Sequence, residues 1–333
     1  MAERVKLKSA GGSYFAAPKP NIDFISSGCQ LLDLALGGGW AERRVANVVG
    51  DKSTGKTLLM IEACANFINK YPKGLVRYRE SESAFDTPYA GALGMPLDRV
   101  DFGNKPLETV EDLFEDLQAL AAKPKAYPQL YIVDSLDALS DRAEMERDID
   151  EGSYGASKAK VLSQMFRRVI GPLERANITL LVVSQVRDKI GISFGRKTTR
   201  SGGKALDFYA SHVVYLSQIK RLQKTIRKVE RPIGVRIKAM VDKNKIGLPF
   251  RQAEFNIMFG YGVDDVEASA RWLHEIGRLG DAELTVEALK DIEALNRGQC
   301  KNVRVAARRA WFEVEKSFLP KRRKYERGNG DAR

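Results

Sequence analysis

A glycine-rich segment near the start of the chain has the residue types and the spacing to bind phosphate. The segment GDKSTGKT (residues 50–57) fits the pattern G-x-x-x-x-G-K-S/T, follows the apolar run VANVV and precedes the helical pattern KTLLMIEACANFINKY. The glycines let backbone N–H groups turn inward toward phosphate oxygens, and the start of the helix adds a favourable partial charge. Lys56 would reach the β- and γ-phosphates, and the Thr57 hydroxyl would ligate Mg²⁺. The predicted nucleotide-binding residues here are Gly50, Asp51, Lys52, Ser53, Thr54, Gly55, Lys56 and Thr57.

A carboxylate that could complete the metal site follows a second apolar run. In LYIVDS (residues 130–135), Asp134 and Ser135 come directly after four apolar residues, as expected at the end of a buried strand. A Mg²⁺ ion at a phosphate-binding loop takes a carboxylate from a neighbouring strand end, which assigns Asp134 to the metal. Capping of the next segment is the alternative role for this aspartate.

Acidic residues also crowd at the end of a third predicted strand. The segment ESESAFD (residues 80–86) carries Glu80, Glu82 and Asp86, which repel one another unless something compensates their charge. A metal-bound nucleotide would do so, and one of the three would then orient or deprotonate the water that attacks the phosphate. A solvated acidic turn is the alternative.

The elements that must position these residues alternate between strand and helix. Strand patterns cover residues 44–50, 74–80, 129–134 and 178–185, and helical patterns cover residues 55–71, 108–122 and 157–176. This alternation predicts an α/β fold with a mostly parallel central sheet and right-handed crossovers. Beyond residue 211 the strand patterns at 212–219, 234–243 and 253–259 have no helix between them, so we expect them to extend the sheet as antiparallel strands.

The ends of the chain differ in composition from its centre. We predict an N-terminal arm over residues 1–24, a core over 25–264, and a small helical C-terminal region with a basic tail over 265–333. No apolar run approaches the roughly 18 residues of a membrane-spanning helix, and no signal-peptide pattern is seen at the N-terminus. The few cysteines and histidines are scattered and form no metal-binding motif. We therefore expect a cytoplasmic protein without a membrane partner.

The charge of the chain favours an anionic partner. The formal net charge is +12, which suits nucleic acid, an anionic membrane or an acidic protein. A long basic and glycine-rich loop, GISFGRKTTRSGGKALDFYASH (residues 191–212), separates two apolar runs. In it, Gly202 and Gly203 would let backbone N–H groups approach phosphates closely. The other candidate DNA contacts in this loop are Arg196, Lys197, Arg200, Ser201 and Lys204, and Arg187 just upstream of it is a further candidate.

A second group of candidate DNA contacts lies on the helix predicted over residues 157–176. Lys158, Lys160, Ser163 and Arg167 recur at roughly helical spacing around its start and could face a phosphate backbone. A solvated basic helix face fits the same spacing.

These segments, in this order, resemble the RecA family of DNA recombinases from about Ile25 to Val263. ISSGCQLLDLALGGG is similar to the family's lead-in to the phosphate loop, ESESAFDTPYAGALGM to its segment with the catalytic glutamate and the adenine contacts, and YIVDSLDAL to its Walker B strand. VVSQVRDKIGISFG resembles the strand ending in the γ-phosphate sensor, SGGKALDFYAS the end of the second DNA-binding loop, and VDKNKIGLPFRQAEFNIMFGYGVD the segment with two lysines that reach a neighbour's ATP.

The resemblance implies a role for each matching residue. Glu82 would polarise the attacking water, Gln185 would sense the γ-phosphate, and Asp86 and Tyr89 would hold the base. Lys243 and Lys245 would contact ATP on the neighbouring protomer, and Phe208 would pack against that protomer. Without the resemblance, DKNK would be an edge strand whose lysines prevent aggregation.

The implied activity is that of an ATP- and Mg²⁺-dependent recombinase and DNA-dependent ATPase. Protomers would form a helical filament on single-stranded DNA and then pair it with duplex DNA, aided by single-strand-binding or loader proteins. The tail residues Lys321–Lys324 and Arg327 would add a duplex contact. Phosphate contacts of this kind give sequence-tolerant, salt-sensitive binding.

Two other functions share the phosphate loop and the carboxylates. A hexameric RecA-fold helicase or translocase would unwind DNA, and an accessory paralogue would bind ATP with weak turnover. The segment VDKNKIGLPF argues against the first, and the presence of both Lys56 and Glu82 argues against the second. Lys52, Lys160 and Asp207 depart from the family pattern, and the divergent ends suggest a phage-type member, in a bacterial or phage-infected cell.

Overall fold

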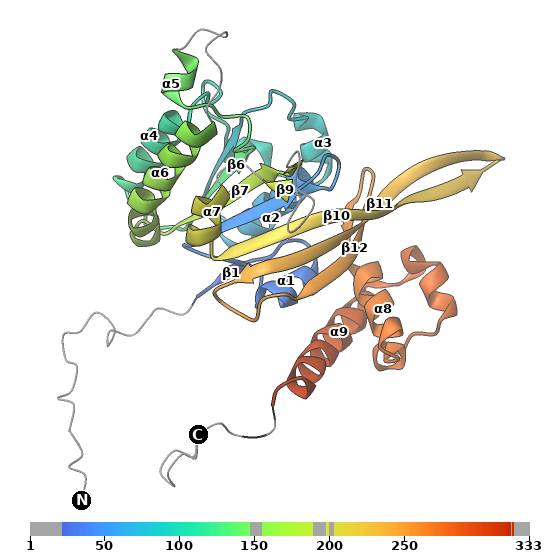
Figure 1. Cartoon of the computed structure of the whole chain (residues 1–333). Coiled ribbons are helices and arrows are strands. Elements are labelled where there is room, and N and C mark those ends of the chain that lie inside the picture. The colour runs from blue at the N-terminus through green and yellow to red at the C-terminus, as the bar shows by residue number, and fades with distance from the viewer. Residues whose placement is uncertain (1–21, 147–154, 189–197, 200–202, 321, 323–333) are drawn as a thin grey trace, which may run out of the picture.

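A nine-stranded sheet forms the centre of the molecule (Figure 1). The computed structural model describes residues 22–146, 155–188, 198–199, 203–320 and 322. The strands lie in the order β13-β12-β11-β10-β3-β7-β6-β4-β5. Their bounds are β3 (Val45–Gly50), β4 (Leu75–Glu80), β5 (Val100–Asp101), β6 (Gln129–Asp134), β7 (Ile178–Gln185), β10 (His212–Ile226), β11 (Val229–Asn244), β12 (Gln252–Met258) and β13 (Gly262–Asp264).

The sheet is parallel on one side and antiparallel on the other. The six strands from β10 to β5 pair in parallel, whereas β11, β12 and β13 continue the sheet beyond β10 as antiparallel strands. The predicted fold class, a mostly parallel sheet extended by antiparallel strands, is confirmed.

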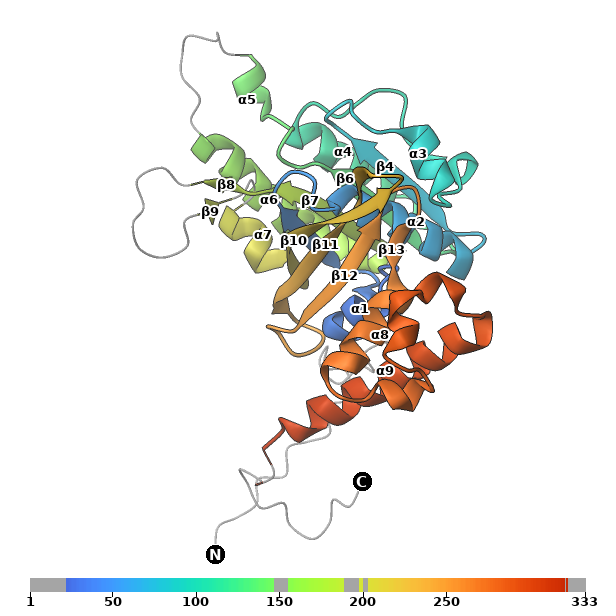
Figure 2. The ribbon, with the colours of Figure 1, turned by 90° about the vertical axis from the view of Figure 1, so that its right-hand side faces the viewer.

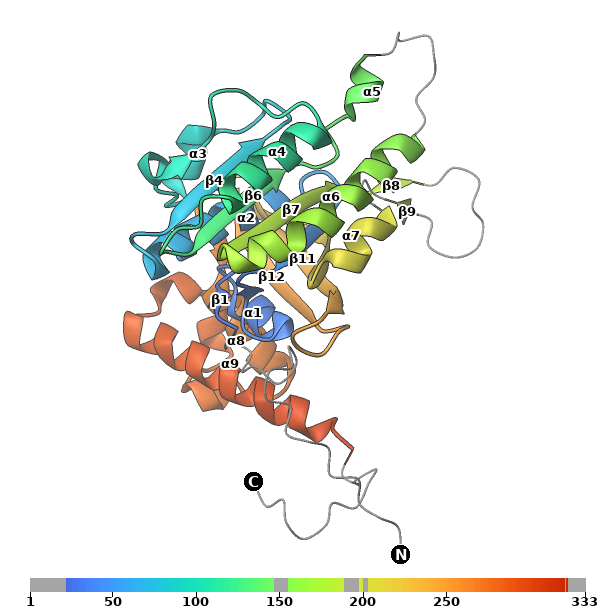
Figure 3. The same ribbon diagram turned by 90° about the vertical axis from the view of Figure 1, so that its left-hand side faces the viewer.

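Helices cover both faces of the sheet because its central strands are apolar on both sides. On one face α1 (Gln30–Leu36), α2 (Lys56–Lys70) and α3 (Thr87–Ala92) pack against one set of alternate strand residues. On the other face α4 (Val110–Ala121), α6 (Gly155–Arg175) and α7 (Gly203–Tyr209) pack against the other set (Figure 3). Val48 of β3 thus belongs to the first core and Val49 to the second.

A long two-stranded ribbon was not predicted. β10 and β11 continue past the predicted strand ends at residues 219 and 234 and project from the sheet (Figure 1). Most ribbon side chains are exposed on both faces, so apolar and polar residues do not alternate there as they do in a half-buried strand. The turn places Arg227 and Lys228 at positive φ, where asparagine and glycine are the usual signals.

The C-terminal elements form a separate apolar cluster beside α1 and β12 (Figure 2). They are α8 (Asp265–Glu275), η3 (Leu279–Ala282), η4 (Glu287–Lys290), η5 (Ile292–Ala294) and α9 (Arg297–Ser317). The remaining short elements are β1 (Phe24–Ile25), β2 (Trp40–Ala41), η1 (Leu97–Arg99), α5 (Arg142–Met145), β8 (Arg187–Asp188) and β9 (Thr198–Thr199). Within the described ranges, no helix has the length and apolar character needed to cross a membrane. The three-part division of the chain remains a prediction.

Candidate nucleotide site

Four strands bring the predicted site residues to one edge of the sheet. β3, β7, β6 and β4 are parallel neighbours, so their carboxyl ends meet at the same edge. Gly50 lies opposite Gln185 in the β3–β7 pair, and Glu80 lies opposite Asp134 in the β4–β6 pair. Residues that are far apart in the sequence therefore converge on the loop that begins α2.

The phosphate-binding loop is compact and held by its own hydrogen bonds. The Thr54 hydroxyl donates to the carbonyl of Asp51 at 2.8 Å, and Lys56 Nζ donates to the same carbonyl at 2.7 Å. Gly55 has a φ of 83°, and a Cβ added there would lie 2.2 Å from Ile257 Cδ1. A residue with a Cβ at this position would have to adopt a left-handed backbone and displace the Ile257 side chain, so glycine is favoured for both reasons.

Lys56 carries its charge next to several carboxylates. Partial burial lowers the pKa of Lys56, and the nearby Asp134 and Glu82 act in the opposite direction. A partly desolvated ammonium of this kind attracts a phosphate more strongly than one in bulk water.

Thr57 and Asp134 form the candidate metal site. The Thr57 hydroxyl donates to Asp134 Oδ2 at 2.7 Å, and the buried Tyr78 hydroxyl donates to the same oxygen at 2.7 Å. Burial raises the pKa of Asp134, while these two hydrogen bonds oppose the shift. A hydroxyl and a carboxylate are hard oxygen ligands, and Mg²⁺ takes its remaining ligands from water and phosphate. The donor set therefore fits Mg²⁺. In the part of the chain that the structure describes, no group of three His, Cys, Asp or Glu side chains could hold a metal alone.

Glu82 is held by two partners from the neighbouring strand ends. Gln185 Nε2 donates to Glu82 Oε1 at 2.8 Å, and the Ser135 hydroxyl donates to the same oxygen. Ser135 itself is buried, and its peptide bond with Asp134 is cis. The predicted catalytic glutamate and the predicted phosphate sensor are thus in direct contact.

The three carboxylates of ESESAFD have separate hydrogen-bond partners. Glu80 accepts hydrogen bonds from the backbone N–H groups of Glu82, Ser83 and Ala84, at 2.8 to 3.1 Å. The Asp86 side chain accepts from the backbone N–H of Tyr89 at 2.9 Å and caps α3. Backbone donors therefore compensate two of the acidic charges, and no metal-bound nucleotide is needed for that.

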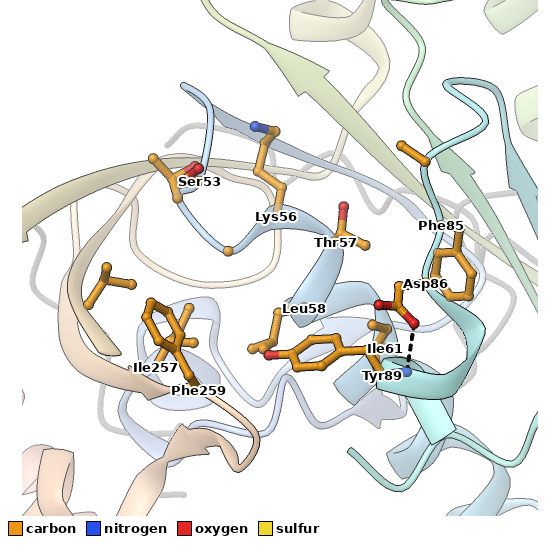
Figure 4. Close-up of a pocket in the computed structure, with 14 residues that line it drawn as sticks. Ser53, Lys56, Thr57, Leu58, Ile61, Phe85, Asp86, Tyr89, Ile257 and Phe259 are labelled. Carbon is orange, nitrogen blue, oxygen red and sulfur yellow. Dashed lines mark hydrogen bonds between the residues drawn. The ribbon is translucent and has the colours of Figure 1, made fainter. Parts of the chain in front are cut away.

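A pocket of about 390 Å³ adjoins the loop. Figure 4 shows the Tyr89 ring beside Leu58 and Ile61 of α2, with Ile257 and Phe259 across the opening. Asp86, at the start of α3, lies beside it. The lining is mostly apolar, as expected for a site that holds a flat ring by packing.

Several lining residues were missed by sequence reasoning. Ile257 alternates with Phe255 and Ala253 as the buried apolar residues of β12, which makes it look like an ordinary core residue. Phe259 directly follows the strand and is 57% exposed, and the sequence shows it only as an aromatic residue at the end of a strand pattern.

Lys243 and Lys245 lie away from the pocket of their own chain. Lys243 pairs with Val213 near the start of β10, and neither lysine is among the residues that line the pocket. Both ammonium groups donate to the carbonyl of Phe208, at 2.9 and 3.0 Å, and Lys243 also contacts the carbonyl of Asp207. They stabilise the negative end of α7. The Phe208 side chain is 70% exposed.

The predicted DNA contacts are placed only in part. Lys160 and Arg167 are exposed on α6, and Ser163 on the same helix is half-buried. Lys158 is half-buried, and its Nζ donates to the carbonyl of Asp137 at 3.1 Å. Arg187 lies in β8, and Gly203 and Lys204 begin α7. Arg196, Lys197, Arg200, Ser201, Gly202 and all of the predicted tail contacts except Arg322 lie outside the described residues.

Comparison with known proteins identifies the family. The family model of the RecA N-terminal domain matches residues 12–264. A Protein RecA of Prochlorococcus marinus (strain NATL1A) is 38% identical over 252 residues, which cover 74% of this chain and 63% of that protein. A Protein RecA of Nostoc punctiforme (strain ATCC 29133 / PCC 73102) is 36% identical over 266 residues, which cover 78% of this chain and 70% of that protein. The match of the family model to most of the chain and the identity to these relatives show that the chain belongs to the RecA family.

Proposed function

We propose that the protein is an ATP-dependent DNA recombinase. It would form a helical filament on single-stranded DNA, pair that strand with homologous duplex DNA and promote strand exchange during recombination and repair. The observation that carries the proposal is the division of the cationic residues between two places. Lys56 lies at the phosphate loop, whereas Lys243 and Lys245 lie away from the pocket of their own chain, which favours a contact with another protomer's nucleotide.

The residues at the sheet edge have the chemistry for ATP hydrolysis. Glu82 would orient the attacking water and accept its proton, held in place by Ser135 and Gln185. Lys56 would stabilise the charge that develops on the γ-phosphate. A Mg²⁺ ion held by Thr57 and Asp134 would neutralise charge on the β- and γ-phosphate oxygens. Tyr89 would stack on the base, beside Asp86.

The nucleotide would also hold protomers together. Lys243 and Lys245 would approach the γ-phosphate bound at the neighbour's loop, and Phe208 would pack against that neighbour. Both lysines already touch the end of α7, so a shift toward a phosphate would change the contacts of the helix that follows the predicted DNA loop. A cation supplied by a neighbour favours the assembled state while ATP is bound and less so after hydrolysis.

DNA would contact the start of α6 and the basic segment that precedes α7. Lys160 and Arg167 would meet phosphates from α6, and the glycines and basic residues of 196–204 would meet them from the second segment. We further propose action in the bacterial cytoplasm or in a phage-infected cell, with single-strand-binding or loader proteins as partners.

The proposal is tested by a strand-invasion assay with a labelled single strand and a homologous supercoiled duplex. The wild-type chain should form joint molecules that require ATP and Mg²⁺. Lys56→Ala should form none, and Glu82→Gln should bind ATP with about 10²–10³-fold slower turnover, the usual loss for one hydrolytic group. Lys125→Ala, an exposed change far from the site, is the control for handling and charge. Normal strand invasion by Lys56→Ala would overturn the proposal.

A further inference from the structure

Asp137 contacts two distant segments from the loop that follows β6. Its carboxylate Oδ2 accepts a hydrogen bond from the backbone N–H of Gln185 at 2.6 Å. Its carbonyl oxygen accepts a hydrogen bond from Lys158 Nζ at 3.1 Å. The loop that carries Asp137 is itself tied to β7, because the N–H of Leu136 donates to the carbonyl of Val183 at 3.0 Å. Asp137 is thus a fixed point between β7 and α6.

The two partners of Asp137 adjoin the two segments assigned to DNA. Gln185 ends β7 and precedes the basic loop that carries one group of predicted DNA contacts, whereas Lys158 lies in the first turn of α6, the helix that carries the other group. Asp134, the candidate metal ligand, lies at the start of the same loop. The short loop after β6 therefore connects Asp134, the candidate metal ligand, to Gln185 and Lys158, which lie next to the two groups of predicted DNA contacts.

Gln185 is held at two points with different strengths. Its backbone is fixed by a short hydrogen bond to a carboxylate, which is a strong type of hydrogen bond, and its side chain donates to Glu82 at 2.8 Å. The side chain can exchange Glu82 for a phosphate oxygen while the backbone stays anchored. If the Gln185 backbone were free to move, the exchange would shift Gln185 alone and would not be transmitted to the neighbouring segments.

We propose that Asp137 is a positioning residue that couples the nucleotide site to both DNA segments, with Lys158 as its link to α6. The inference rests on the proposed function, because it concerns how bound ATP strengthens DNA binding. It also assigns Lys158 a contact within the chain in place of the direct phosphate contact that the sequence suggested. Energetic coupling between two sites is reciprocal, so DNA should strengthen nucleotide binding by the same factor.

The test compares DNA affinity in two nucleotide states. The dissociation constant of a fluorescein-labelled oligo(dT) is measured by anisotropy, without nucleotide and with Mg²⁺ and ATPγS, and the ratio of the two constants is the coupling factor. Asp137→Ala should lower this ratio about tenfold, the effect expected from the loss of one hydrogen bond to a charged group. Asp137→Asn should keep most of the ratio, because its amide oxygen still accepts from the Gln185 N–H. Lys158→Met should lower the ratio as well.

Lys160→Met is the matched control on the same helix. Lys160 is exposed two positions further along α6, so its loss should weaken DNA binding equally in both nucleotide states and leave the ratio unchanged. A wild-type ratio near one would contradict the proposed function and this inference with it. A normal wild-type ratio that Asp137→Ala and Lys158→Met leave intact would overturn this inference alone, even if thermal unfolding showed both variants to be less stable. If Asp137→Ala does not fold, an unchanged ratio in Lys158→Met is sufficient to reject the link.

Discussion

Asp134 and His212 are both buried, but their surroundings act differently on the charged form of each side chain. Asp134 receives hydrogen bonds from Tyr78 and Thr57, which stabilise its carboxylate at the candidate metal site. His212, at the start of β10, is fully buried beside Trp40, and neither of its ring nitrogens has a hydrogen-bond partner among the described residues. A protonated His212 would therefore place a charge in the core, which the nearby Leu36 backbone and Asn244 side chain offset only in part.

His212 should make stability depend on pH in a defined direction. Burial lowers its pKa from 6.5 to about 4, so in this range the unfolded chain binds more protons than the folded one. Its contribution to the free energy of unfolding is thus fully present above pH 6.5 and falls by about 3 kcal/mol as the pH drops toward 4. Urea unfolding of the wild type and His212→Gln at several pH values isolates this term from other titrating groups. A difference between the two proteins that stays constant from pH 7 to 4 would contradict it.

At the level of elements, β12 shapes the nucleotide pocket through its contact with the phosphate loop. Ile257 fills the space above Gly55 and also lines the pocket. A side chain at Gly55 would push Ile257 out of position and deform both the loop and the pocket.

Gly55→Ala and Gly94→Ala form a matched pair that separates conformation from space. Both glycines have positive φ, 83° and 93°, but a Cβ at Gly94 would meet nothing within 4 Å. Each substitution should cost about 1–2 kcal/mol for the left-handed backbone, and Gly55→Ala about 1 kcal/mol more because Ile257 must leave its rotamer. Urea unfolding measures the difference, and a fluorescent ATP analogue should bind Gly94→Ala normally and Gly55→Ala weakly. Equal losses in both variants would refute the role of Ile257.

The elements that could be predicted from the sequence are those with a strong local pattern. The phosphate loop has a fixed spacing, and β6 and β7 are continuous apolar runs ended by polar residues, so Asp134 and Gln185 could be placed at one sheet edge. The Asp137–Gln185 contact and the ring of Phe259 depend on how separate segments pack, which no local pattern records. The hydrogen bonds that Glu80 and Asp86 accept from nearby backbone N–H groups were not predicted, because the positions of those groups depend on the local backbone conformation.

At the scale of the whole molecule, Lys56 lies at one edge of the sheet, whereas Lys243 and Lys245 lie toward the opposite edge. This separation predicts complementation between protomers. Lys56→Ala and the double variant Lys243→Ala, Lys245→Ala should each hydrolyse little ATP alone. In an equal mixture, about a quarter of the head-to-tail interfaces would join an intact loop to intact lysines, and turnover should recover to about that fraction. Lys56→Ala mixed with Glu82→Gln is the control: both defects lie on the same side of the interface, so no recovery is expected. Lack of recovery in the first mixture as well would place the lysines outside the neighbour's site.

In the proposed function, one site joins ATP, a neighbouring protomer and single-stranded DNA. ATP turnover should therefore be measured with and without single-stranded DNA, and the same mixtures should be imaged by negative-stain electron microscopy. We expect the DNA to stimulate turnover and to carry helical filaments that form only when ATP is present. ATP turnover that is the same with and without DNA, or closed rings in place of filaments, would contradict the proposed function.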